Sequence, residues 1–153
     1  MPFYDYSVNA AGSFGPGTEY IGAKTDRPIL ISKLHYEFHY WPEDDMQCWL
    51  GYFIGTDRFK KALEDISPPV TGVEFDKVEI SGDADEFERV WRKARPDSEL
   101  GSWHWFKITG KPGVDDFAQR KPDLVVSERV AQLLRSFGMN YGELKECDDE
   151  PLR

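Results

Sequence analysis

Two stretches of the chain repeat one pattern, and this repeat constrains the fold more than any other feature. Residues 53–58 and 125–129 each run from apolar residues into a hydroxyl side chain, an acid and an arginine. Apolar residues then follow at the same offsets of 3, 6, 7 and 10 from the hydroxyl residue, Thr56 or Ser127. This spacing is typical of an amphipathic helix capped by that hydroxyl group. The repeat predicts a duplicated strand–helix–strand unit that carries no chemistry of its own.

The remaining patterns predict a sheet with a third helix. Apolar and polar residues alternate over 33–40, which predicts a half-buried strand. Its inward face would carry Leu34, Tyr36, Phe38 and Tyr40, and its solvent face Lys33, His35, Glu37 and His39. Residues 48–54 are apolar throughout and predict a second, central strand. A helix is expected over 83–94, with further strands over 70–80, 100–109, 123–126 and 141–147.

Length and composition favour one domain. The chain has 153 residues, so we expect a single α+β domain over 1–153, with a largely antiparallel sheet and about three amphipathic helices. Within it, the glycine- and proline-rich stretch 1–28 predicts irregular chain, and 148–153 an acidic tail. No apolar run is long enough to span a bilayer, and no export signal opens the chain. We therefore expect a cytoplasmic protein with Cys48 and Cys147 as free thiols.

The net charge of the chain indicates which classes of partner to expect. Nineteen basic and 28 acidic side chains leave a net charge of −9. A nucleic-acid-binding protein normally shows a basic face, so neither nucleic acid nor a membrane is expected as a partner. An acidic chain is suited to a basic protein partner, although solubility alone also explains such a charge.

Three residues on one face of the predicted strand 33–40 are the main candidates for catalysis. His35, Glu37 and His39 could hold a metal, with His104 as a further ligand, or could act as an acid–base group. Their other interpretation is the polar face of a half-buried strand. Sequence motifs of serine hydrolases, zinc proteases and dithiol redox proteins are absent. We therefore assign no catalytic residue, no metal ligand and no cofactor.

Acidic clusters and one tryptophan are the candidates for partner binding. Trp41 stands beside a proline and three acids, and aromatic anchors surrounded by charge are typical of protein interfaces. A second acidic pair occupies a polar loop later in the chain. The predicted partner-binding residues are Trp41, Glu43, Asp44, Asp45, Asp115 and Asp116.

The C-terminal third resembles a family of bacterial polymorphic-toxin immunity proteins. The resemblance lies in Trp-Phe-Lys-Ile-Thr-Gly at 105–110, Asp-Asp-Phe at 115–117, Asp-Leu-Val-Val-Ser-Glu-Arg-Val at 123–130, Leu133-Leu134 and Gly142-Glu143. It is clear over about 100–147, weaker over 48–80, and does not extend to 1–30. The resemblance implies a non-enzymatic protein that binds a cognate toxin domain and occludes its active site. It transfers no catalytic residues, and contact residues vary within such families.

Two other functions remain open from the sequence. The first is a small metal-dependent or acid–base enzyme that uses His35, Glu37 and His39. The second is a generic acidic protein-binding adaptor, which could mimic nucleic acid. Metal content and competition with nucleic acid would separate these alternatives from a toxin inhibitor.

Overall fold

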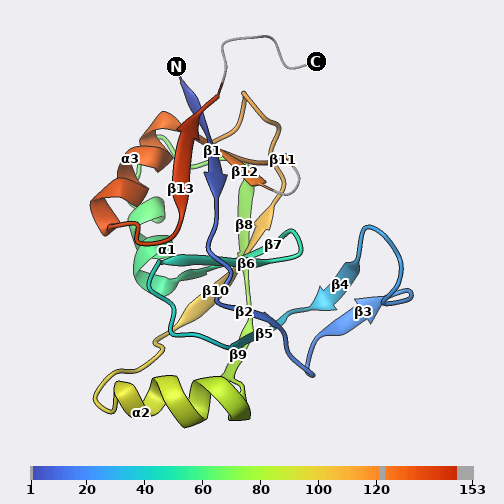
Figure 1. Ribbon diagram of the computed structural model, residues 1–153. Helices are drawn as coiled ribbons and strands as arrows, with labels where there is room; N and C mark the ends of the chain where they lie inside the picture. Colours follow the sequence, from blue (N-terminus) through green and yellow to red (C-terminus); the bar gives the residue numbers. More distant parts are fainter. Residues whose placement is uncertain (1, 121–122, 148–153) are drawn as a thin grey trace.

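The computed structural model describes residues 2–120 and 123–147, and it shows an α+β fold built largely from antiparallel strands (Figure 1). The first four-stranded sheet has the order β11 (Phe117–Arg120), β12 (Asp123–Ser127), β1 (Phe3–Ser7) and β13 (Glu143–Glu146). The second has the order β6 (Met46–Trp49), β7 (Tyr52–Thr56), β10 (Trp103–Ile108) and β8 (Val73–Asp76). The predicted fold class is therefore confirmed.

The two sheets follow one plan. In each, a hairpin leads into a helix, α1 (Asp57–Glu64) after β7 or α3 (Glu128–Phe137) after β12. The chain then returns as an edge strand, β8 or β13, and a strand from elsewhere in the chain fills the gap beside the hairpin. That strand is β10 in the second sheet and the N-terminal β1 in the first. The duplication seen in the sequence thus extends to eight strands.

The rest of the chain adds three smaller parts. A third sheet has the order β2 (Gly12–Phe14), β5 (His35–Phe38) and β9 (Glu79–Gly82), and β5 and β9 run parallel. A ribbon of β3 (Glu19–Ile21) and β4 (Leu30–Lys33) projects from the body (Figure 1). The helix near residue 90 consists of a π-helix, η1 (Ala84–Trp91), followed by the short α2 (Arg92–Ala94).

Two hydrophobic clusters lie on opposite faces of the second sheet. Phe53 and Phe106 belong to the cluster that also contains the buried faces of α1 and α3. Ile54, Trp103 and Trp105 belong to the other, which packs against the third sheet and η1. Adjacent residues of β7 point to opposite faces, so this sheet connects the two clusters.

Several sequence predictions about strands and their faces are wrong. Residues 48–54 form a hairpin rather than one strand, because Leu50 and Gly51 both have positive φ, 47° and 84°, and reverse the chain. The stretch 1–28 is not irregular, since it contributes β1, β2 and β3. His35 does not face solvent, because the loop before β3 covers it and leaves it only 4% exposed.

The predicted helix over 83–94 is present, but its apolar stripe is less buried than expected. Asp83 caps η1 by accepting from the amides of Glu86 and Phe87. In this helix only Phe87 is fully buried, and Val90 is exposed. A π-helix has more residues per turn than an α-helix, so apolar residues at α-helical spacing do not stay on one face. The predicted acidic tail at 148–153 lies outside the described residues.

Candidate functional site

Two buried aspartates hold the two hairpin-to-helix turns in the same way. Asp45 accepts from the hydroxyl of Thr56 and from Arg58, with Nε–Oδ2 at 2.7 Å and Nη2–Oδ1 at 2.6 Å. In the second unit Asp116 accepts from the hydroxyl of Ser127 at 2.6 Å and from the Nε and Nη2 atoms of Arg129, at 2.8 and 2.7 Å.

We call these two groups the clamps. In both, the aspartate precedes its hydroxyl partner by 11 residues and its arginine by 13. The amide of Thr56 also donates to the carbonyl of Asp45, and that of Ser127 to the carbonyl of Asp116. Thr56 additionally caps its helix through the amide of Phe59, whereas Ser127 makes no side-chain cap bond, so its predicted capping role is wrong. The bidentate geometry fixes the direction in which each helix leaves its sheet.

A third acid, Asp44, is also used internally. It accepts from the amides of Asn140, Tyr141 and Gly142, at 2.5, 3.0 and 2.6 Å. These bonds join the loop before β6 to the turn before β13. Backbone amides supply the donors, so Asp44 has a structural role that neighbouring charges in the sequence do not reveal.

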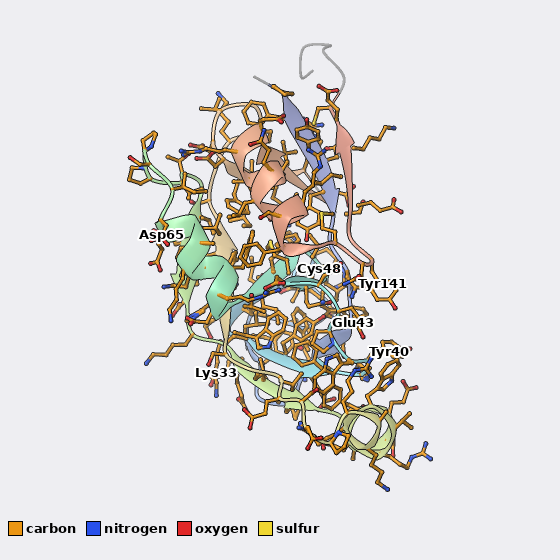
Figure 2. All side chains as sticks on the ribbon, turned by 90° about the vertical axis from the view of Figure 1, so that its left-hand side faces the viewer. Lys33, Tyr40, Glu43, Cys48, Asp65 and Tyr141 are labelled. Atoms are coloured by element: carbon orange, nitrogen blue, oxygen red, sulfur yellow. The ribbon has the colours of Figure 1, made fainter. Side chains whose placement is uncertain are left out.

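The predicted partner-binding residues therefore divide into two groups. Asp44, Asp45 and Asp116 are 4%, 8% and 8% exposed. Trp41, Glu43 and Asp115 are half-buried and accessible from solvent. Figure 2 shows Glu43 between Tyr40 and Tyr141 along one side of the molecule. For Trp41, Glu43 and Asp115, a role in partner binding stays a prediction. Because the other three are buried, the six residues do not form one continuous exposed patch.

Trp41 is held in place by its neighbours. Its ring stacks on Phe87, with ring centroids 5.6 Å apart and an interplanar angle of 8°. The guanidinium of Arg95 lies 5.4 Å from the centre of the Trp41 ring and forms an ion pair with Glu43 at 2.9 Å. A fixed, partly exposed aromatic ring loses little conformational entropy on binding, which suits an interface anchor.

The histidines do not form a metal site among residues 2–120 and 123–147. No group of three histidine, cysteine or acidic side chains there is arranged to hold a metal ion. His35 accepts from the amide of Gly17 at its Nδ1 atom, 2.8 Å away. His104 pairs with Asp57 at 2.8 Å, on a different sheet. His39 instead contacts Ser13 and Asp83, two residues that sequence reasoning did not connect with it.

A further cavity lies beneath the projecting ribbon, where sequence reasoning placed no site. It has a volume of about 650 Å³. We call it the ribbon groove, and it is lined by Arg27, Pro28, Ile29, Leu30, Leu50, Gly51, Tyr52 and Gln119.

Leu30 and Leu50 stand at the ribbon groove with exposed fractions of 51% and 56%. The hydroxyl of Tyr52 donates to the carbonyl of Ile29, and the side-chain amide of Gln119 donates to the carbonyl of Gly51 at 2.9 Å. These bonds tie the ribbon and the hairpin turn to the body, so the groove is preformed. The Leu-Gly pair at 50–51 is the one sequence signal that could have located it, because a turn at that place exposes the leucine.

Neither thiol has the environment of a nucleophile. Burial raises the pKa of the Cys48 thiol to about 11, and its Sγ donates to the carbonyl of Val8. Burial also raises the pKa of Cys147. Both thiols are therefore protonated at neutral pH, the form that does not act as a nucleophile.

Comparisons of this chain with known protein families, with curated proteins and with solved structures found no match. Across the parts of the chain that the structure describes, no helix is both long and apolar enough to cross a membrane. The function is therefore inferred from the sequence resemblance and from the geometry of this molecule.

Proposed function

We propose that the protein is an immunity protein that binds a basic cognate toxin domain and occludes its active site. The C-terminal resemblance and the net charge of −9 support this class of function. The structural observation that carries the proposal is Leu50, an exposed leucine in a left-handed backbone conformation beside the ribbon groove.

Leu50 is unfavourable for the isolated chain in two respects. A left-handed conformation costs an ordinary L-residue about 1–2 kcal/mol, and asparagine or glycine is the usual choice in such a turn. The leucine also leaves more than half of its surface in water. Strained and exposed apolar positions are typical of binding sites, because burial against a partner offsets the cost of the strain and of the exposed apolar surface.

The ribbon groove suits an apolar side chain from a protein partner. Leu30 of β4 and Leu50 of the β6–β7 turn line it from two separate segments, and Tyr52 supplies an aromatic wall. Apolar anchors that fill preformed grooves carry most of the energy in protein interfaces. The acidic charge of the whole protein then accelerates association with a basic toxin rather than fixing the contact itself.

The experiment begins with identification of the partner. The tagged protein is incubated with lysate of its own host, and the retained proteins are identified. A partner that is toxic when expressed alone and harmless together with this protein supports the proposal. A retained protein without toxicity, or no retained protein at either low or high salt, contradicts it.

The variant Leu50→Asn then tests the groove. It removes the apolar side chain but places a residue in the turn that tolerates positive φ. We expect affinity for the toxin to fall about 10- to 100-fold, the loss of one buried leucine. Val114→Asn is the matched control, since Val114 is an exposed apolar residue that does not line the groove. Equal affinity of the two variants would exclude the groove as the docking surface.

The acidic residues are tested separately. Only Glu43 and Asp115 are suitable for charge reversal, because Asp44, Asp45 and Asp116 are buried and bonded internally. If Glu43 and Asp115 act through long-range attraction, Glu43→Lys and Asp115→Lys lower the association rate at low salt and leave it nearly unchanged at high salt. An unchanged association rate at low salt would exclude these two residues.

A further inference from the structure

Three side chains from separate parts of the chain form a series of close polar contacts. Ser13 lies on β2, His39 directly follows β5, and Asp83 precedes η1. The Oγ atom of Ser13 is 2.8 Å from Nε2 of His39. The Nδ1 atom of the same ring is 3.2 Å from Oδ2 of Asp83. This is the order of groups by which serine nucleophiles are activated on unrelated folds.

The direction of the hydrogen bonds follows from Asp83. Amide bonds, chiefly from Phe87, hold the pKa of Asp83 below its ordinary value, so it is a carboxylate at neutral pH. A carboxylate only accepts, and Nδ1 of His39 therefore carries the proton. Nε2 of a neutral ring is then an acceptor, and the hydroxyl of Ser13 donates to it. His39 is thus arranged to take the Ser13 proton.

A second serine–histidine pair in the molecule lacks this arrangement. The Oγ atom of Ser81 is 2.7 Å from Nε2 of His35. The amide of Gly17, however, donates to Nδ1 of His35, so the proton of the neutral ring is on Nε2. His35 therefore donates to Ser81 and cannot act as its base. The two serine–histidine hydrogen bonds have similar lengths, but serine donates in one and histidine donates in the other. Ser81 is therefore a matched control for Ser13.

Ser13 and His39 border a cavity that a small molecule can enter. Its volume is about 260 Å³, and its lining also includes Tyr40, Trp49 and Glu86. The His39 side chain is one-third exposed, so the bond to Ser13 is reachable from solvent. The two aromatic rings offer apolar and cation–π contacts. The carboxylate of Glu86 disfavours anions, and the cavity therefore suits a neutral or cationic acyl group.

We propose that Ser13 is an activated nucleophile that accepts an acyl group from a small neutral or cationic ester. The Oγ–H proton passes to Nε2 of His39 as Oγ bonds to the carbonyl carbon. The ester C–O bond then breaks, and the departing alcohol takes the proton from Nε2. Water cleaves the acyl-serine in the same manner and restores Ser13. Asp83 acts as a positioning residue for the imidazole. This activity does not depend on the proposed toxin binding.

The first experiment measures acylation of the whole protein by p-nitrophenyl acetate and labelling by a neutral fluorophosphonate. Mass spectrometry of the peptides should place the label on Ser13. Ser13→Ala should abolish labelling, and His39→Gln should lower the rate at least about 100-fold, the typical contribution of a general base. Ser81→Ala should label at the rate of the unmodified protein. Thermal unfolding shows that each variant is folded.

The variant Asp83→Asn separates positioning from folding. Asparagine caps helices as well as aspartate does, so η1 is retained. We expect the maximal labelling rate to fall at least about tenfold while the half-saturating probe concentration stays unchanged, since Asp83 does not contact the probe. Absence of labelling in the folded unmodified protein overturns the proposal. Labelling at another residue, or equal losses in Ser13→Ala and Ser81→Ala, also overturns it.

Discussion

Substitution of Asp116 by asparagine is the sharpest test of the clamps that hold the duplicated units. The carboxylate accepts from Ser127 and Arg129 through Oδ1, and from Arg129 and the amide of Thr71 through Oδ2. An amide side chain keeps one oxygen and turns an NH₂ group toward donors. Asp116→Asn therefore loses the bonds of one oxygen and the charge on both.

The expected loss of stability is about 2–3 kcal/mol. Breaking a buried ion pair by removing one partner costs about 3–5 kcal/mol. Asp116 is buried, but the Arg129 side chain is 28% exposed and regains water when its partner is lost. This places the effect at or below the lower end of that range. Asp115→Asn is the control, since the Asp115 side chain accepts one hydrogen bond, from the amide of Lys111 at 2.7 Å. For this variant we expect a change in stability below about 0.5 kcal/mol.

Denaturant unfolding followed by tryptophan fluorescence measures both variants. The pH dependence adds a second criterion. The hydrogen bonds of Arg129, followed by those of Ser127 and Thr71, lower the pKa of Asp116 in the folded state. Its stabilisation is complete above the ordinary aspartate pKa of about 4 and is lost as the pH falls through the lower folded pKa. The difference between Asp116→Asn and the unmodified protein should therefore shrink below about pH 4. A loss under 1 kcal/mol at pH 7, or a difference independent of pH, would refute the clamp.

Three further results are expected. The free energy of unfolding of Leu50→Asn should lie within about 1 kcal/mol of that of the unmodified protein, because relief of the left-handed turn offsets the lost burial. Leu50→Ala should be less stable than Leu50→Asn by about 1 kcal/mol in denaturant unfolding, because alanine loses the same burial without that relief. Thr56→Ala should cost about 1–2 kcal/mol by the same assay, since the hydroxyl caps α1 and donates to Asp45. A circular permutant that joins Cys147 to Pro2 through a short linker and opens the chain after β1 should fold with native circular dichroism, because the Cys147 amide donates to the Phe3 carbonyl at 2.8 Å.

The local elements were predictable where the signal lies within a few residues. The offsets of apolar residues after Thr56 and Ser127 located α1 and α3, and Phe59, Leu63, Val130 and Leu134 are buried as expected. The burial of Leu134, like that of the other apolar residues of these two helices, can be predicted from the helical period alone. The α+β class followed from the mixture of such helices with alternating strands.

Long-range contacts are the part that sequence patterns did not reveal. β1 pairs with β12 and β13, so its partners lie at the other end of the chain. Gly12 lets β2 lie close to β5, since a Cβ atom at this position would lie 2.1 Å from the carbonyl oxygen of Glu37. The stretch 1–28 was therefore predicted as irregular although its glycines serve packing. The same limit applies to His39, whose partners Ser13 and Asp83 are 26 and 44 residues away in the sequence.

The acidic clusters show why charge in the sequence is a poor guide to exposure. Asp44 and Asp45 are adjacent to Glu43, yet three backbone amides satisfy Asp44 and a bidentate arginine satisfies Asp45. Burial of a carboxylate requires such partners, and those partners come from distant segments. The apolar ribbon groove was missed for the opposite reason, because exposed leucines in a turn resemble core residues when only composition is considered.

Comparison of the two units within the molecule separates structural from functional residues. What the units share is the aspartate clamp and the apolar helix stripe, and both are explained by packing. Their difference is that the first unit has residues 77–102 inserted between β8 and β10, whereas β1 completes the second from the other end of the chain. Asp83 belongs to that insertion, and Ser13, Leu30 and His39 lie in the segment before the first hairpin. Ser13, His39, Asp83 and Leu30 therefore lie outside the plan that the units share, while Leu50 lines the ribbon groove from the turn of the first hairpin. This placement is expected if a duplicated frame carries function in its loops and added segments.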